Sequence, residues 1–178
     1  AAMRALAADG VRVLTYGLKA DADIRAEALR LAADGAQFMV TWANERHDYS
    51  IPLAGRHNVS NALAALAAGF VLGLTPQEIQ AGLCALVPSK MRYEVHTVGA
   101  WRLINDAYNA SPSSMRAALE TTAALYHGRR IAVLGDMLEL GDAAEEAHRE
   151  IGRRAAELGF AALVTYGPQA QWMHEAAE

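Results

Sequence analysis

The chain has 178 residues, with 16 lysines and arginines against 20 aspartates and glutamates, which gives a formal net charge of −4. This length accommodates one large domain or two small ones. The charge balance argues against a nucleic-acid partner, because no cluster of basic residues alternates with aromatic residues. No apolar run approaches the roughly 20 residues that span a bilayer, so we expect no membrane span.

The chain contains a single cysteine, Cys84, so a disulfide framework is excluded. Its apolar neighbours favour a buried and unreactive thiol. The N-terminus lacks the basic flank and apolar core of a secretion signal, and the cytoplasm is therefore the expected compartment. Residues 1–9 have the character of a helix interior, which suggests that the sequence is part of a longer polypeptide.

The start of the chain is predicted to be rich in strands. Residues 22–34 are ambiguous, because their apolar spacing suggests a helix whereas Asp34 followed by Gly35 suggests a hairpin turn. The family resemblance described below favours strands there. Further strands are expected at residues 11–16, 38–42 and 49–53.

Two helices are predicted next. A helix over residues 58–72 is indicated by apolar residues at helical spacing and by the closing Gly73. A second helix, ending near Leu86, begins with a capping box in which Thr75 is the N-cap and Glu78 lies at N3. The residues on the buried face of the first helix are Val59, Leu63, Leu66 and Phe70.

The pattern breaks at residues 87–90, which we take as the domain boundary. Beyond it a hairpin around Gly99 is followed by alternating helices and strands, which predicts a parallel sheet covered by helices. Asp142 and Glu145 suggest another cap pair. The expected elements are strands 93–98 and 101–104, helix 112–126, strand 130–135, helix 142–158, strand 160–166 and helix 168–177.

A polar run at residues 105–112 (NDAYNASP) follows the strand at 101–104. It presents a carboxylate (Asp106), a phenol (Tyr108) and an amide (Asn109) at a strand end. Ser111 and Pro112 are expected as the cap and first residue of the following helix. This arrangement is typical of a ligand-binding edge in an α/β sheet, although a polar loop that only caps the helix would look the same.

Three further segments carry candidate site residues. Asn58 and Asn61 share a helix face, and their paired amides could contact a purine edge or simply cap the helix. Arg92 offers a planar donor fork suited to phosphate, or to a surface ion pair. The loop after strand 130–135 carries Asp136 and Glu139 at the expected ligand edge, or as ordinary turn residues.

The four segments 55–61 (GRHNVSN), 91–94 (MRYE), 105–112 and 134–141 (LGDMLELG), taken as an ordered set, resemble the Mur ligase family. The resemblance is strongest to the branch that adds D-alanyl-D-alanine to UDP-MurNAc-tripeptide. It implies an α/β fold in which residues 1–88 are the C-terminal part of a central ATP-binding domain. Residues 89–178 would then be a Rossmann-like C-terminal domain with a mostly parallel sheet, truncated at its end.

The resemblance also implies roles for individual residues. Tyr108 and Asn109 would lie near the reacting groups. Ser111 stands where the family has asparagine, so an amide-dependent substrate contact there is in doubt. The nucleotide would be contacted by His57, Asn58 and Asn61 at the adenine, by Arg92 at the phosphates and by Asp106 at the ribose, and the substrates by Ser111, Asp136 and Glu139.

The implied activity is ATP-dependent amide ligation in peptidoglycan precursor synthesis. Mg²⁺ would act in the complete enzyme through ligands outside this chain. The chain has no phosphate-binding loop of the Gly-x-x-x-x-Gly-Lys-Ser/Thr type, so we expect it to be inactive alone. The alternatives are another Mur ligase, a folylpolyglutamate-type ligase, or a non-catalytic α/β binding module. The sequence does not indicate an oligomeric state.

Overall fold

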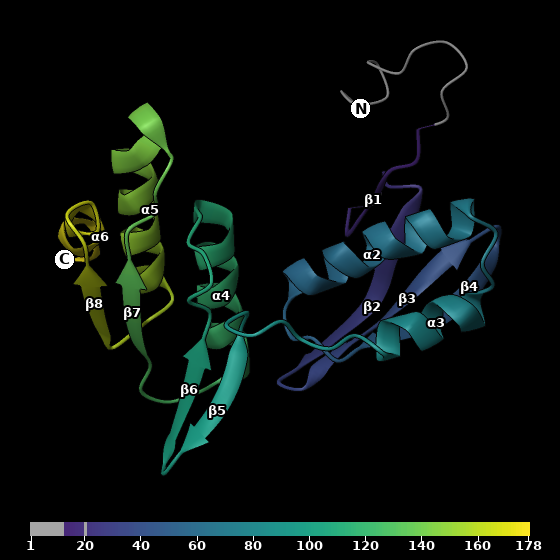
Figure 1. The fold of residues 1–178 in the computed structure, drawn as a ribbon, viewed down its shortest axis with the longest axis horizontal. Coiled ribbons are helices and arrows are strands. Elements are labelled where there is room, and N and C mark those ends of the chain that lie inside the picture. Colours follow the sequence, from purple (N-terminus) through teal and green to yellow (C-terminus); the bar gives the residue numbers. More distant parts are fainter. Residues whose placement is uncertain (1–12, 20) are drawn as a thin grey trace. The chain divides into compact units, whose positions relative to one another are not determined.

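The computed structural model describes residues 13–19 and 21–178. The helix predicted for residues 1–9 lies outside the described residues, and the described part of the strand predicted at 11–16 is β-structure only from Tyr16. The chain divides into two compact units, residues 1–87 and 88–178 (Figure 1). The first unit contains β1 (Tyr16–Gly17), β2 (Ile24–Ala32), β3 (Gly35–Trp42), β4 (Glu45–Ile51), α2 (Arg56–Val71) and α3 (Pro76–Cys84).

In the first unit, β2, β3 and β4 form an antiparallel meander, and β1 pairs with β2 in parallel. The ambiguous segment 22–34 is therefore a strand followed by a hairpin turn, and the prediction of a strand is confirmed. The β3–β4 turn is made by Ala43 and Asn44, which have φ angles of 51° and 67°. Positive φ at both positions gives the turn a twist that matches the flanking strands.

Helices α2 and α3 belong to the same hydrophobic core as this sheet. Val59, Leu63 and Leu66 of α2 are buried as predicted, and Ile79 of α3 lies in the same cluster. Phe70 is only partly buried, with its ring 4.8 Å from that of a sheet tryptophan. The sheet contributes Ile24, Ala26, Ala36, Phe38, Val40, Tyr49 and Ile51.

The capping box of α3 is confirmed, whereas the burial of Cys84 is not. Thr75 Oγ1 accepts a hydrogen bond from Glu78 N at 3.2 Å, and Glu78 Oε2 accepts from Thr75 N at 2.8 Å. Cys84 is exposed at the end of α3, where the Gln80 side chain donates to its sulfur. The prediction is wrong because α3 turns Leu83, one residue earlier, towards the core.

The second unit combines an antiparallel hairpin, β5–β6, with a parallel pair, β7–β8. The α/β class is therefore confirmed, and so is the hairpin turn at Gly99, which has a φ of 59°. The elements are β5 (Glu94–Val98), β6 (Trp101–Asn105), α4 (Pro112–Leu125), β7 (Ile131–Gly135), a 3-10 turn (Gly141–Ala143), α5 (Ala144–Glu157), β8 (Ala162–Tyr166) and α6 (Gln171–Ala177).

The starts of α4 and α5 differ in how they are capped. Ser111 caps α4 and Pro112 is its first residue, as predicted. The predicted cap pair of Asp142 and Glu145 is wrong, because a 3-10 turn precedes α5 and no side chain caps it. The acidic residues in the first turn of α5 instead interact favourably with the positive end of the helix dipole.

The core of the second unit lies where α4, α5 and α6 meet the β7–β8 pair. Met137 and Met173 are fully buried. Gly152 allows α5 and α6 to approach closely, since a Cβ atom at this position would lie 2.0 Å from the Met173 carbonyl oxygen. The other buried apolar residues are Met115, Leu119, Ala132, Ile151 and Ala155.

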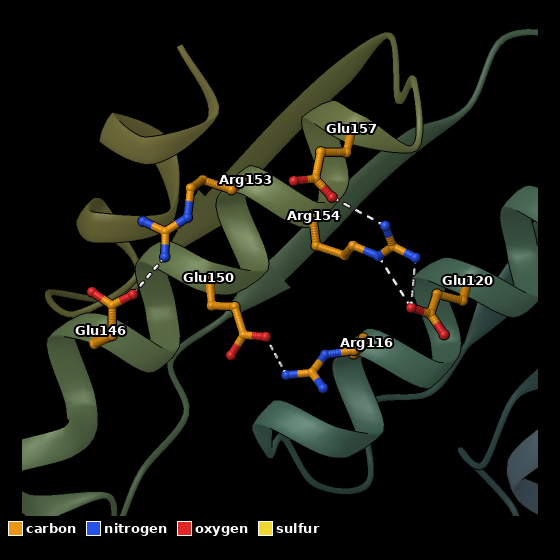
Figure 2. A network of polar contacts seen from close by, with 7 residues as sticks. All are labelled: Arg116, Glu120, Glu146, Glu150, Arg153, Arg154 and Glu157. Atoms are coloured by element: carbon orange, nitrogen blue, oxygen red, sulfur yellow. Dashed lines mark hydrogen bonds and ion pairs between the residues drawn. The ribbon is translucent and has the colours of Figure 1, made fainter.

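Polar side chains connect the outer surfaces of α4 and α5 (Figure 2). Arg116 pairs with Glu150, and Arg154 NH2 lies 2.7 Å from Glu120 Oε1. Arg154 also reaches Glu157 on its own helix at 3.0 Å. Exposed ion pairs contribute roughly 0.2–1 kcal/mol each to the free energy of unfolding. This network therefore adds little stability and mainly restricts the relative orientation of the two helices.

Arg130 joins the C-terminal ends of the same two helices. Its NH1 donates to the Tyr126 carbonyl at 3.0 Å, and its NH2 donates to the Leu158 carbonyl at 2.8 Å. Tyr126 and Leu158 are the C-caps of α4 and α5, where carbonyl groups lack partners within the helix. A guanidinium at this position also interacts favourably with both helix dipoles.

None of the helices in the described part of the chain is long and apolar enough to cross a membrane.

We expect Arg130→Ala to lower the free energy of unfolding of the second unit by about 2–4 kcal/mol, because several helix-end carbonyls lose a charged donor. The measurement is urea unfolding of the 178-residue chain, read from the NMR signals of Leu119 and Ile151. Arg129→Ala is the matched control, since Arg129 is the exposed neighbour and should change stability by less than about 0.5 kcal/mol. Equal effects of the two substitutions would contradict the capping role.

Candidate functional site

The start of β5 and the end of β6 are joined by two hydrogen bonds next to the predicted site residues. Tyr108 N donates to the Met91 carbonyl at 3.1 Å, and Tyr93 N donates to Asp106 Oδ1 at 2.9 Å. Met91 and Tyr93 both have positive φ, 59° and 50°, which is unusual for bulky residues. Strained backbone of this kind persists where the surrounding structure holds it, often at functional sites.

This strained segment brings Arg92 and Tyr108 together. The Arg92 guanidinium carbon lies 4.3 Å from the centre of the Tyr108 ring. The Tyr108 side chain is 65% exposed, so the stacked pair faces solvent. A cation over an exposed aromatic ring contributes about 0.5–1 kcal/mol, which is enough to bias the direction of the guanidinium fork.

Tyr93 anchors the segment to α4. Its hydroxyl lies 3.0 Å from Thr122 Oγ1, and burial raises the pKa of this phenol to about 12 despite the hydrogen bond with Thr122. The neighbouring Asp106 carboxylate adds a small increase in the same direction. Tyr93 therefore acts here as a neutral hydrogen-bonding anchor.

A groove of about 1240 Å³ lies between β6 and β7 and is lined in part by α4. Its lining includes apolar residues such as Leu103 and Val133. Three predicted site residues, Asp106, Asn109 and Asp136, also line it, and they stand at or just after the carboxyl ends of β6 and β7. The structure thus brings these three side chains to one groove.

Asn109 and Ser111 follow on the same loop. Asn109 Oδ1 accepts a hydrogen bond from the Ala110 amide at 2.9 Å. Ser111 Oγ accepts from Ser114 N at 3.2 Å and lies 2.9 Å from Ser114 Oγ. The Ser111 hydroxyl therefore caps α4.

Asp136 connects the loop after β7 to the start of α6. Its Oδ1 accepts a hydrogen bond from Ala170 N at 2.6 Å. Gly167 passes so close that a Cβ atom there would lie 2.4–2.5 Å from the carboxylate atoms. Glu139, in the same loop, is exposed with a φ of 64° and does not line the groove.

The predicted residues of the first unit gather at the start of α2. Gly55 is the N-cap of this helix and no side chain caps it, so Asn58 is not the cap. The Asn58 side chain donates to the Ala54 carbonyl at 2.8 Å, and Asn61 Nδ2 lies 3.5 Å from Asn58 Oδ1. Asn58 holds the preceding loop, while the amide of the exposed Asn61 is accessible; His57 lies beside them in the first turn.

The described residues include no group of three or more histidine, cysteine, aspartate or glutamate side chains placed to hold a metal ion.

Comparisons with known proteins show the family of the chain. The Mur ligase middle domain profile matches residues 1–69, and the Mur ligase glutamate ligase domain profile matches residues 91–178. The chain belongs to the Mur ligase family. It is 38% identical over 165 residues to the UDP-N-acetylmuramoyl-tripeptide--D-alanyl-D-alanine ligase of Bacillus subtilis, and this alignment covers 92% of the chain.

Two other Mur ligases are similar. The enzyme of the same name from Escherichia coli is 35% identical over 152 residues, covering 84% of this chain and 33% of that protein. The crystal structure of MurF from Acinetobacter baumannii superimposes with a TM-score of 0.85 at 32% identity, covering 93% of this chain and 36% of that one. The chain also spans only 36% of the length of the B. subtilis relative.

Two residues that shape the candidate site, Tyr93 and Gly167, were not among the predicted site residues. Tyr93 links Asp106 to α4 through its amide and its hydroxyl. The sequence indicates the role of Tyr93 only weakly, because a tyrosine before a strand is usually a packing residue. The contact between Gly167 and Asp136 joins two loops that are distant in sequence, so no local pattern shows it.

We expect the stability of this Mur ligase unit to fall as the pH rises from about 10 to 12, because the folded state favours the protonated Tyr93 phenol. The stability contributed by Tyr93 is fully present below the pKa of its phenol in the unfolded state, about 10. It is lost as the pH rises towards the pKa of the phenol in the folded state. Tyr93→Phe should flatten this part of the pH profile in urea unfolding experiments. Tyr166→Phe, at a tyrosine that is 81% exposed, is the control and should leave the profile unchanged.

Glu139→Gly should stabilise the chain by about 0.5–1 kcal/mol, because glycine relieves the left-handed backbone strain at the cost of a more flexible unfolded state. Glu139→Gln keeps the Cβ atom and should leave the stability unchanged. Thermal unfolding of the two variants beside the parent chain tests this. A glycine variant less stable than the glutamine variant would show that the backbone at Glu139 is not strained.

Proposed function

We propose that this chain is part of an ATP-dependent amide ligase that joins D-alanyl-D-alanine to UDP-MurNAc-tripeptide in peptidoglycan precursor synthesis. The observation that carries the proposal is the clustering of Arg92, Asp106 and Tyr108 beside a groove, in a chain 38% identical to a ligase of that name. Residues 1–88 would be the C-terminal part of the central domain and residues 89–178 part of the C-terminal domain, acting in the cytoplasm.

The reaction we propose has two steps. The free carboxylate of the tripeptide attacks the γ-phosphorus of ATP, so that ADP leaves and an acyl phosphate forms. The amine of D-alanyl-D-alanine then attacks the acyl carbon, loses a proton, and expels inorganic phosphate as the amide bond forms. Such transfers require positioning and charge neutralisation more than covalent chemistry by the protein.

The residues of the second unit fit the nucleotide side of this reaction. Arg92 is exposed and oriented by the Tyr108 ring, so its donor fork is available to phosphate oxygens. Asp106 borders the groove at the end of β6, where a carboxylate can accept hydrogen bonds from ribose hydroxyls. Tyr108 and Asn109 would orient the reacting groups beside them.

The first unit offers a surface for the adenine base. The carboxamide of Asn61 is exposed and can both donate to and accept from a purine edge. Asn58 would define the position of this amide through its hydrogen bonds to Ala54 and Asn61, and His57 is proposed to contact the adenine beside them. Asp136, Glu139 and Ser111 are proposed to face the substrates, and Mg²⁺ would be held by residues of the complete enzyme outside this chain.

In the complete ligase, Arg92→Ala and Asp106→Asn should each raise the KM for ATP about 5- to 150-fold, the effect of losing 1–3 kcal/mol of binding. The asparagine retains an oxygen that can accept from Tyr93 N, so the strained segment stays in place. Steady-state kinetics with varied ATP is the measurement.

Arg153→Ala is the matched control for these variants. Arg153 is an exposed arginine of α5 that does not line the groove, and its NH2 pairs with Glu146. Its removal should leave the KM for ATP unchanged. If Arg92→Ala and Asp106→Asn also leave the KM and kcat for ATP unchanged, neither residue contacts the nucleotide.

A further inference from the structure

His148 of α5 is fully buried, and both of its ring nitrogens have backbone partners. Nδ1 lies 2.6 Å from the Ala144 carbonyl oxygen, and Met137 N lies 3.0 Å from Nε2. A carbonyl oxygen can only accept and a backbone N–H can only donate. The two partners therefore select the neutral imidazole that carries its proton on Nδ1 and accepts through Nε2.

The Met137 amide belongs to the loop that carries Asp136 and Glu139. This loop is strained, since Glu139 has a φ of 64°. It is fixed by the buried Met137 side chain, by the hydrogen bond from Met137 N to His148, and by the bond from Ala170 N to Asp136. A strained conformation persists only where several such contacts determine it.

The imidazole also contacts α6. The His148 ring packs edge-on to Trp172, with 5.8 Å between ring centres. His148 therefore joins three parts of the second unit: its own helix through Ala144, the loop after β7 through Met137, and α6 through Trp172. Each aromatic contact of this kind adds to the fixed orientation of the ring.

We propose that His148 is a positioning residue that holds the loop of residues 136–140 in its strained form and thereby sets the directions of Asp136 and Glu139. The proposal rests on the proposed function only in treating these two carboxylates as substrate-binding groups. A neutral imidazole donates to the Ala144 carbonyl and accepts from the Met137 amide at the same time, which no hydrocarbon ring can do. Phenylalanine preserves a planar ring but leaves the Met137 amide buried without an acceptor, which is costly.

The first test is the tautomer of His148 in the 178-residue chain, read from long-range ¹⁵N–¹H NMR correlations. The expected result is a protonated Nδ1 and an unprotonated Nε2. A proton on Nε2 in the neutral ring would overturn the proposal, and this measurement needs no variant.

The second test compares amide hydrogen exchange in His148→Phe and His148→Gln. In His148→Phe the amides of Met137 and Ala170 should exchange at least about tenfold faster. Glutamine offers an oxygen near the position of Nε2 and should restore part of the protection. His174→Phe is the matched control, because His174 is exposed on α6, and it should change neither amide.

Unchanged exchange at Met137 in a folded His148→Phe variant would overturn the proposal, as would equal exchange in the phenylalanine and glutamine variants. If His148→Phe does not fold, the tautomer of the parent chain decides. These readouts do not depend on ligase activity. If the tautomer and the exchange rates are as expected while the complete protein shows no ligation, the proposed function fails and the positioning role of His148 stands.

Discussion

The hydrogen bonds between residues 91–93 and 106–108 hold the exposed candidate-site side chains of the second unit in place. Arg92 and Tyr108 face solvent and have little packing to fix them, so their positions depend on the backbone on either side. That backbone is strained at Met91 and Tyr93, and the buried phenol of Tyr93 connects it to α4. The site is therefore only as rigid as the packing of α4.

The packing of α4 depends in turn on contacts far from the groove. Arg130 ties the ends of α4 and α5 together, and Gly152 lets α5 approach α6. The loop with Asp136 and Glu139 is fixed against the same helices by His148. The loops on both sides of the candidate site are thus held by the same packed helices. This explains how two strained loops keep their conformation in a small unit.

Much of this fold follows from local signals in the sequence. The caps at Thr75 and Ser111 and the turn at Gly99 were predictable because each depends on a few adjacent residues. The predicted cap at Asp142 failed because the chain makes a 3-10 turn there first. The exposure of Cys84 was missed because apolar neighbours in sequence do not show which face of a helix is buried.

The site itself was only partly predictable. The strand-end placement of Asp106 and Asp136 led to the expectation of a shared edge, and both line one groove. The stacking of Arg92 on Tyr108 and the contact of Gly167 with Asp136 could not be predicted, because they depend on how separate loops approach. Spacing alone left the roles of Asn58 and Asn61 open between capping and recognition, and their proposed role at the adenine comes from family resemblance.

The most direct test of this account is phosphate release from ATP by this chain and by the complete polypeptide, with and without UDP-MurNAc-tripeptide and D-alanyl-D-alanine. The account predicts release only from the complete polypeptide, and only when both substrates are present. Absence of release from the complete polypeptide under these conditions would contradict it.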